Sequence, residues 1–375
     1  MDSLQYSQEL ISFESTSTLS NVAISNYVEN ILKKIGFEIE RLEYDDPTGI
    51  RKACVVGKKG AGRGGMAYFG HTDVVPVNAW FSKTKGPYTP NIIDDKLYGR
   101  GSCDMKGSIA CILAAAEQVP AEKLKNPLYI TCTSDEEISM EGAMQVAQNS
   151  QFYREMVEGK SNGVIGEPTM LEVVYSHKGT AGFQAISQGK AAHSSTNEGI
   201  NANLAMIPFL VEMKNLHEET ESDPKWKNEE FDPPTMRCNI IMKDNCKALN
   251  ITPPESICIV RFRPMPGQDI EPLIDRAREA AEKCGLEFET GLSGTPLYSD
   301  PQSDFMKDVL QIAGKKTPRT VSYGSDGMAF TDMEKLVLFG PGNIAMAHTD
   351  NEWIDLEQLK LGTEKYSKLI EYWCN

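Results

Sequence analysis

The 375-residue sequence has no surplus of positive charge and no long apolar run. Asp and Glu outnumber Lys and Arg 53 to 38, and the resulting formal net charge of -15 opposes the phosphate attraction on which nucleic-acid binding depends. The longest apolar runs, such as Ile109–Ala116 and Leu336–Phe339, are far shorter than the roughly 20 residues of a membrane-spanning helix. We therefore expect neither a nucleic-acid partner nor a membrane span.

The nine cysteines are irregularly spaced, and no Cys-x-x-Cys pair occurs among them. Such spacing is typical of reduced, mostly buried thiols rather than of a disulfide framework or a zinc ribbon. Residues 1–14 also lack the basic start and the apolar stretch of a signal peptide. Both observations favour a cytoplasmic protein.

What the sequence does have is a regular alternation of strand-like and helical patterns. Short β-prone runs at 37–42, 53–56, 66–69, 128–133 and 163–165 alternate with amphipathic or apolar helical segments at 20–36, 105–118 and 140–148. This alternation predicts an α/β sandwich around a largely parallel or mixed sheet. The glycine-rich run 60–65 leads into a strand rather than a helix, so it favours a hairpin turn over a nucleotide-binding loop.

The order of elements changes after residue 175. Strands are expected at 183–188, 237–242, 256–262 and 286–290, with helices at 201–217 and 269–284, which gives the order βαββαβ. Helices at 304–312 and 356–372 and a strand at 335–339 then return to the first pattern. We predict a domain formed by 1–175 and 293–375, with an α+β domain of residues 176–292 inserted into it.

Histidine is scarce, with five residues in the chain, and three of them lie in contexts that suit a functional site. His71 directly follows the strand at 66–69 and is two residues before Asp73, which can fix the imidazole tautomer. His193 and His348 lie in loop-like segments beside small residues and acids. Each histidine taken alone is equally compatible with a structural or surface role.

Carboxylates follow the same strand ends. Asp104 lies in the glycine-rich turn 99–107, where a helix N-cap is the alternative role; Glu136 and Glu137 follow the strand at 128–133; and Glu167 follows the strand at 163–165. Together with the histidines they form a ligand set for two divalent ions that share a bridging acid and a water. The reaction expected of such a site is hydrolysis of an amide or ester, with one glutamate binding metal and its neighbour activating the water.

Six motifs carry a family resemblance. They are His71–Pro76, Gly99–Gly107, Ser134–Glu137, Gly166–Thr169, Ala192–Ser195 and Gly340–His348, in that order along the chain. In these motifs the sequence resembles the M20 group of dinuclear zinc amidohydrolases and peptidases, and within that group it is most similar to the acetylornithine deacetylases.

The resemblance implies a role for each matching residue. His71, Asp104 and Glu167 would bind one ion, and Asp104, Glu137 and His348 would bind the other, with Zn²⁺ as the expected metal and Co²⁺ or Mn²⁺ also compatible with these ligands. Glu136 would be the general base and then the general acid, and Asp73 would orient His71.

The resemblance also makes the inserted domain a lid and dimerisation domain. His193 would reach the partner subunit's active site and stabilise the oxyanion, although a buried polar residue at a helix start is the alternative for it. Arg263 and Asn250 match positions that hold a substrate carboxylate, and the loop with Ser325 and Asp326 would touch the substrate.

The expected activity is hydrolysis of the amide bond of a small N-acyl amino acid by a homodimer. The first candidate substrate is N-acetyl-L-ornithine, cleaved to L-ornithine and acetate in arginine biosynthesis. N-succinyl-diaminopimelate, N-acetylcitrulline and peptides, the last cleaved by a carboxypeptidase, remain alternatives for the same site. A member that keeps the fold only for binding is the alternative from a different class.

Overall fold

The computed structural model describes residues 1–81, 84–246, 248–291 and 293–375, and it divides into two compact units. Unit 1 comprises Met1–Ser176, Leu297–Arg319 and Ser325–Asn375. Unit 2 comprises His177–Pro296 together with Thr320–Gly324. The domain boundary expected after residue 292 falls on Leu292, which lies outside the described residues.

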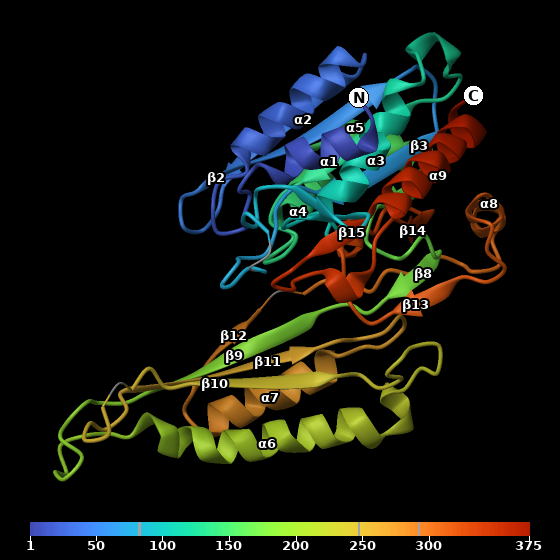
Figure 1. Cartoon of the computed structure of the whole chain (residues 1–375). Helices are drawn as coiled ribbons and strands as arrows, with labels where there is room; N and C mark the ends of the chain where they lie inside the picture. Colours follow the sequence, from blue (N-terminus) through green and yellow to red (C-terminus); the bar gives the residue numbers. More distant parts are fainter. Residues whose placement is uncertain (82–83, 247, 292) are drawn as a thin grey trace. The chain divides into compact units, whose positions relative to one another are not determined.

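Unit 1 is organised around a mixed sheet of eight strands in the order β1-β2-β6-β3-β7-β14-β8-β13 (Figure 1). The strands are β1 (Glu38–Asp45), β2 (Arg51–Lys59), β3 (Met66–His71), β6 (Leu128–Thr133), β7 (Asn162–Ile165), β8 (Val174–His177), β13 (Arg319–Val321) and β14 (Leu336–Leu338). The four central strands β6, β3, β7 and β14 are parallel, and β2 and β8 flank them in antiparallel pairing. The predicted mixed α/β sandwich is therefore confirmed.

Helices cover both faces of this sheet because its strands are apolar on both sides. The first layer contains α1 (Ser3–Ile11), α2 (Val22–Lys34), α3 (Lys106–Glu117) and α9 (Leu356–Cys374), and the second contains α4 (Glu141–Asn149) and α5 (Gln151–Glu158). Alternation along β2 shows the two sides, since Lys59 donates to Ala116 O on α3 while Lys58 donates to Glu155 on α5. Helix α8 (Asp304–Ala313) packs on α9 through stacking of Phe305 and Trp373.

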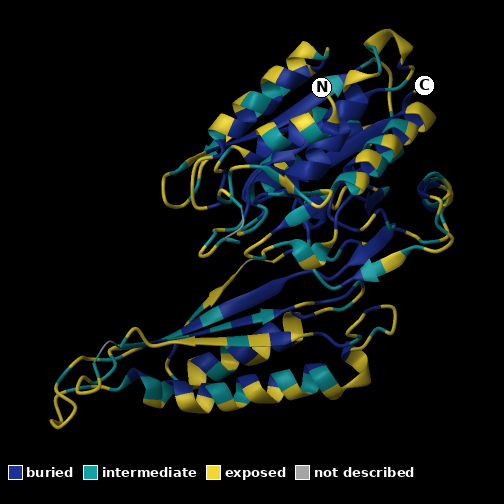
Figure 2. Cartoon of the chain, in the orientation of Figure 1, coloured by how far each residue is buried: buried dark blue, intermediate teal, exposed yellow. Residues whose placement is uncertain are grey.

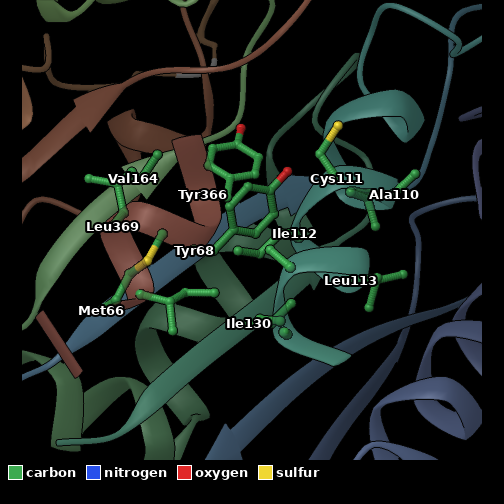
Figure 3. Close-up of a cluster of buried hydrophobic side chains, with 14 of the residues drawn as sticks. Met66, Tyr68, Ala110, Cys111, Ile112, Leu113, Ile130, Val164, Tyr366 and Leu369 are labelled. Carbon is green, nitrogen blue, oxygen red and sulfur yellow. The ribbon is translucent and has the colours of Figure 1, made fainter. Parts of the chain in front are cut away.

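The core of unit 1 lies between β3, α3 and α9, where Figure 3 shows Tyr68 and Tyr366 among aliphatic side chains. Ala110, Ile112 and Leu113 are fully buried, so α3 is apolar around its whole circumference. Two tyrosines and one serine form a buried chain of hydroxyls there. Tyr68 Oη lies 2.8 Å from Ser108 Oγ, Ser108 Oγ lies 2.8 Å from Tyr366 Oη, and Tyr366 donates to Phe339 O.

Unit 2 contains an antiparallel sheet of four strands in the order β10-β11-β9-β12. The strands are β9 (Ala181–Gln188), β10 (Cys238–Lys243), β11 (Glu255–Phe262) and β12 (Glu287–Thr290), and the helices are α6 (Ala202–Ser222) and α7 (Glu271–Lys283). Both helices lie on one face of the sheet (Figure 1), against a core that includes Phe183, Phe209 and Val260. The chain order βαββαβ agrees with the sequence pattern.

Several elements of the fold differ from the sequence analysis, which did not expect α5, β8 and β13. Helix α1 was not expected, although Asp2 and Gln5 form a capping box at its start. The hairpin expected at 60–65 is wrong, because β6 lies between β2 and β3 and pairs with both of them. The three-residue strands β4 (Asn91–Ile93), β5 (Lys96–Tyr98) and β15 (Trp353–Asp355), which form a separate small sheet, were not expected either.

Two expectations about surface and redox state can be compared with the structure. All nine cysteines are free thiols, and seven of them are buried, as expected. Among the described residues, no helix combines the length and the apolar character that crossing a membrane requires.

Candidate metal centre

The carboxyl ends of the parallel strands bring the predicted ligands to one edge of the unit 1 sheet. His71 is the last residue of β3 and pairs in register with Thr133, the last residue of β6. Glu136 and Glu137 follow β6, and Glu167 follows β7 by two residues. Parallel strands that end in register place the residues after them side by side, which is where open α/β sheets bind their ligands.

Asp104 lies between two histidines that come from distant parts of the chain. Its Oδ1 is 3.2 Å from His71 Nε2, and its Oδ2 is 3.5 Å from His348 Nε2. Helix α3 begins at Lys106 with Met105 as its N-cap residue, and no side-chain hydrogen bond caps it. The N-cap alternative for Asp104 is therefore wrong, and the carboxylate has one oxygen for each histidine.

Glu137 and Glu167 extend the cluster on its two sides. Glu137 Oε2 is 3.0 Å from His348 Nε2, and single ligand atoms of His71, Asp104 and Glu137 all lie within 4.8 Å of one another. Glu167 Oε1 is 4.0 Å from His71 Nε2. This buried oxygen has no hydrogen-bond partner among the described residues.

The residues fit a metal centre by distance and by chemistry. Ligand atoms about 2.0–2.1 Å from a tetrahedral Zn²⁺ are about 3.3 Å from one another. The three contacts of 3.0, 3.2 and 3.5 Å between imidazole nitrogens and carboxylate oxygens agree with that spacing. An unpartnered carboxylate oxygen beside them is costly in a protein interior unless a cation or a donor satisfies it.

The electrostatics of the cluster also indicate a place for positive charge. Burial raises the pKa of Glu167 well above its ordinary value, and the negative charge of Asp104 adds to this rise against the opposing His71. Burial lowers the pKa of His71, but its hydrogen bond to Asp104 and nearby carboxylates raise it well above the ordinary value. Hydrogen bonds to Asp104 and Glu137 raise the pKa of His348 to about 10. Carboxylates thus crowd together here, and only cations relieve such repulsion without protonation.

Glu136 lies within this cluster but does not belong to the group of three residues, His71, Asp104 and Glu137, whose ligand atoms are closest together. Its Oε2 is 4.0 Å from His71 Nε2, and its side chain is largely buried. Burial raises the pKa of Glu136 well above the ordinary value, with the charges of Glu167 and Glu137 adding to the rise and His71 opposing it.

Asp73 contacts the centre differently from the expectation. His71 Nδ1 lies 2.9 Å from the main-chain oxygen of Asp73, whereas the Asp73 carboxylate is 3.7 Å from that nitrogen. The carboxylate instead accepts the N–H groups of Glu136 and Glu137 and the Ser17 hydroxyl. Asp73 therefore holds the ring of His71 through its backbone and the loop of the two glutamates through its side chain.

A buried ion pair supports the same loop. Lys52 Nζ lies 2.6 Å from Asp135 Oδ1 and donates to Ser17 O and Leu19 O, and Tyr44 donates to the other oxygen of Asp135. Asp135 adopts a positive φ of 61°. These contacts fix the backbone immediately before Glu136.

Ser325 and Asp326 are buried within unit 1. Ser325 Oγ accepts the N–H of Gly327 at the start of a short 3-10 helix. Asp326 Oδ2 accepts the hydroxyl of Thr133 at 2.5 Å, and burial raises the pKa of Asp326 to about 7. The Asp326 charge acts on both Glu136 and Glu167, so this carboxylate lies next to the acid cluster.

The remaining predicted residues belong to unit 2. His193 is exposed in a loop and forms an isolated antiparallel β-bridge with Ile251. The alternative of a buried residue at a helix start is therefore wrong. His193 Nδ1 lies 2.7 Å from Ser195 Oγ, which leaves Nε2 for another partner. Asn250 is exposed, and Arg263 is an exposed residue directly after β11.

The sequence analysis missed one carboxylate that contacts the centre's backbone. Glu352 accepts the main-chain N–H groups of Gly101, Cys103 and Asp104 as well as a hydrogen bond from Arg100. The available signal was its place four residues after His348, in an acidic segment. Its partners lie about 250 positions away in sequence, so no local pattern could identify them.

Comparison with known proteins places the chain in a family. The model of peptidase family M20/M25/M40 matches residues 67–372. An acetylornithine deacetylase from Myxococcus xanthus is 29% identical over 98% of this chain and 96% of its own length. A second one, from Photorhabdus laumondii, is 32% identical over 95% of this chain and 91% of its own length.

Solved structures share the fold at lower sequence identity. An M20 family metallo-carboxypeptidase from Sulfolobus solfataricus has a TM-score of 0.74 and 16% identity, covering 100% of this chain and 99% of its own. A dinuclear metal binding peptidase of family M20 from Bacillus subtilis has a TM-score of 0.64 and 15% identity, with 98% and 96% coverage. The family model, the relatives and the fold agree with the resemblance in the sequence motifs, and the chain belongs to peptidase family M20/M25/M40 as a metal-dependent hydrolase.

Proposed function

We propose that the chain removes the acyl group from N-acetyl-L-ornithine, using two divalent metal ions. One observation carries the proposal: Asp104 directs one carboxylate oxygen toward His71 and the other toward His348. A carboxylate between two imidazoles is the arrangement that a ligand bridging two cations requires. The names of the relatives from Myxococcus xanthus and Photorhabdus laumondii, which match nearly the whole chain, support the choice of substrate.

We assign His71, Asp104 and Glu167 to one ion and Asp104, Glu137 and His348 to the other. Zn²⁺ is the proposed metal, and Co²⁺ and Mn²⁺ suit the same nitrogen and oxygen donors. When bound, the two ions would lower the pKa of a water toward neutrality and polarise the amide carbonyl. The unpartnered Oε1 of Glu167 and the 3.0–3.5 Å spacing of the other donors support this assignment.

Glu136 is the proposed proton carrier. It accepts a proton from the attacking water and returns it to the nitrogen of the departing amino acid. Its place inside the cluster, 4.0 Å from His71 Nε2, supports this role. The Asp73 carboxylate binds the backbone N–H groups of Glu136 and Glu137. It would thereby fix the position of both side chains, Glu136 for proton transfer and Glu137 for metal binding.

Unit 2 is the proposed source of substrate recognition. Arg263 and Asn250 would hold the α-carboxylate of the substrate, for which the bidentate guanidinium is suited. His193 of a partner subunit would stabilise the oxyanion. Its exposed position in a loop supports this role, and so does the contact of Nδ1 with Ser195, which leaves Nε2 to bind the oxyanion. Ser325 and Asp326 would contact the substrate where it meets the acid cluster, since the charge of Asp326 acts on Glu136 and Glu167.

A homodimer through unit 2 completes the proposal. Leu204, Ile207 and Val211 are exposed along α6, and Met242 is exposed on the side of β10 that faces α6; we call these four residues the α6–β10 stripe. Ile207 and Met242 line one groove, together with polar residues that include Asn203 and Asp244, so the helix and the strand share one surface. Strand β10 is an edge strand with a free pairing side among the described strands. A second copy matches both features because a two-fold axis pairs identical edges and identical stripes.

The compartment and the pathway belong to the same proposal. Nine free cysteines, most of them buried, are compatible with the reducing cytoplasm. Release of L-ornithine there would serve arginine biosynthesis.

Amine release by the chelator-treated protein, with and without added Zn²⁺ or Co²⁺, tests the proposal. N-acetylornithine, N-acetylcitrulline, N-succinyl-diaminopimelate and dipeptides are the substrates to compare. Metal-restored activity that is highest on N-acetylornithine is expected. Activity that survives complete metal removal would contradict the metal centre, whereas metal-restored activity on another of these substrates would overturn only the substrate assignment.

A further inference from the structure

Glu352 is a buried carboxylate outside the proposed ligand set, and its side chain is 1% exposed. Its Oε1 accepts the N–H groups of Cys103 at 2.9 Å and Asp104 at 3.0 Å. Its Oε2 accepts the N–H of Gly101 at 2.9 Å and Arg100 Nη1 at 2.7 Å. An ionised carboxylate accepts about four hydrogen bonds, so these four donors use its full capacity.

Three of the four donors belong to the backbone turn that presents Asp104. The turn can bring several N–H groups to one carboxylate because Gly101 adopts φ of +82°, where a side chain would be strained and would collide with Val74. Strand pairing delivers the acceptor, since Trp353 of β15 lies opposite Tyr98 of β5 and Gly99 N–H donates to Glu352 O. Glu352 thus binds the turn from Gly99, through its main-chain oxygen, to Asp104, through its carboxylate.

The same segment also carries a ligand. His348 lies four residues before Glu352, and its Nε2 is 3.5 Å from Asp104 Oδ2. Asp104 is therefore held at two places by residues 348–352, through its side chain at one and its backbone N–H at the other.

We propose that Glu352 is a positioning residue of the metal centre, which fixes the Asp104 carboxylate between its two histidines and ties it to His348. The inference rests on the proposed function, because it gives Asp104 the bridging role. Residues that hydrogen-bond to a metal ligand commonly change metal affinity 10- to 100-fold when they are replaced. Because Asp104 serves both ions, losing Glu352 weakens both metal equivalents, whereas losing His348 weakens one.

A purely structural role is the alternative to exclude. Removing one partner of a buried pair such as Arg100 and Glu352 is strongly destabilising, because it leaves an uncompensated buried charge. A structural role lowers the melting temperature of the metal-free protein and leaves the metal affinity of the folded molecules unchanged. Positioning lowers the metal affinity itself and alters the ligand geometry around the ion.

The test is a titration of the metal-free full chain with Zn²⁺ and with Co²⁺, for wild type and for Glu352→Gln. The glutamine keeps the shape but replaces one acceptor oxygen with a donor, which cannot accept the N–H groups of the turn. We expect 10- to 100-fold weaker binding of both equivalents, an altered visible spectrum of the bound Co²⁺, and a fall in kcat that exceeds any change in KM. Glu357→Gln, an exposed change five residues away, is the matched control and should behave as wild type.

The outcomes separate the inference from the proposed function. Wild type that binds no divalent metal overturns both. Wild type that binds two equivalents, with Glu352→Gln equal to it in affinity and Co²⁺ spectrum, overturns only the positioning role, whatever the change in melting temperature. If Glu352→Gln does not fold, Glu352→Asp takes its place, because it keeps both oxygens on a shorter side chain; an affinity and spectrum equal to wild type would then overturn the inference.

Discussion

Unit 1 covers its sheet on both faces, whereas unit 2 covers its sheet with helices on one face only. Strands β3 and β6 are buried at every residue, while β10 is exposed along most of its length. Figure 2 shows the same contrast, with the central strands of unit 1 buried and the outer side of α6 exposed. On that side Leu204 is 66% exposed and Val211 is 57% exposed. The helices of unit 1 bury both faces of its sheet, whereas unit 2 leaves apolar surface exposed that a partner can cover.

Both units bond buried lysines to main-chain oxygens, as Lys59 does in unit 1, but among the described residues only unit 1 also has fully buried ion pairs. Unit 1 pairs Lys52 with Asp135 and Arg100 with Glu352, and each pair fixes a loop that carries proposed ligands. In unit 2, Lys178 Nζ donates to the main-chain oxygens of Pro233 and Thr235, and burial lowers the pKa of Lys178 to about 8. The ion pairs of unit 1 hold the loops that carry the proposed ligands, which is compatible with the proposed division into catalysis by unit 1 and recognition by unit 2.

The largest expected effect is the loss of activity in Glu136→Gln, which removes the proposed proton carrier of unit 1. A positioned general base contributes about 10²–10⁴-fold to the rate, so we expect kcat to fall about 10³-fold. Metal content should stay at the wild-type level, because Glu136 is outside the proposed ligand set. Steady-state kinetics with metal analysis measure both quantities, and Glu141→Gln at the start of α4 is the control. Near-normal activity with normal metal content would remove Glu136 from the mechanism.

The pH dependence of stability tests how unit 2 tolerates a buried base. Burial lowers the pKa of His177 to about 4, and the charge of Arg263 opposes protonation further. The unfolded chain has an ordinary His pKa of about 6.5, so between pH 6.5 and 4 it binds more protons than the folded chain. The free energy of unfolding should therefore fall by about 3 kcal/mol as pH drops through this window, with the full stability present above it.

Urea unfolding of wild type and His177→Leu between pH 7 and 4 measures this effect. The difference in unfolding free energy between the two proteins should change across the window, because leucine binds no proton. A difference that is constant with pH would show that His177 is not held neutral.

A charge introduced into the α6–β10 stripe tests whether the exposed apolar surface of unit 2 forms the proposed dimer. Val211→Glu places two carboxylates near a two-fold axis and removes apolar burial from both copies, so the dissociation constant of the dimer should rise on the order of a hundredfold. Sedimentation analysis over a range of concentrations measures it, with Lys283→Glu on α7 as the control. Monomeric Val211→Glu should keep its metal and lose activity, because His193 is proposed to act on the partner subunit. A wild type that is monomeric at all concentrations would refute the dimer.

Arg263→Met tests recognition by unit 2 and has the smallest expected effect. Losing a charge-assisted contact to the substrate carboxylate should raise KM on the order of tenfold, with a smaller change in kcat. Arg278→Met on α7 is the matched control. An ester or amide of the substrate carboxylate should be a poor substrate for wild type and be less affected by the change. Equal KM values for Arg263→Met and wild type would show that the carboxylate binds elsewhere.

The sequence analysis located the sheet edge at which the proposed ligands gather, because local patterns encode the strands that end there. Strand β6 begins and ends where its apolar run does, and the acids that follow it were readable as ligands for the same reason. Contacts between distant segments were not readable. The Asp73 carboxylate binds N–H groups that lie 63 and 64 positions away in the sequence. Strand β6 lies between β2 and β3, although both of these strands precede it in the chain, and no local pattern predicts that position. The cap of α1 was readable from Asp2 and Gln5, but the apolar face of this short helix was not conspicuous.

The buried hydroxyls of Tyr68, Ser108 and Tyr366 have a direction. Tyr366 gives its proton to Phe339 O, so Ser108 must give its own to Tyr366, and Tyr68 must give its own to Ser108. Only this order of protons satisfies all three groups. The core beneath Gly166 and Glu167 therefore carries a small ordered dipole that cannot reverse without breaking a bond, and its three hydroxyl protons should exchange slowly enough with solvent to be observed by NMR.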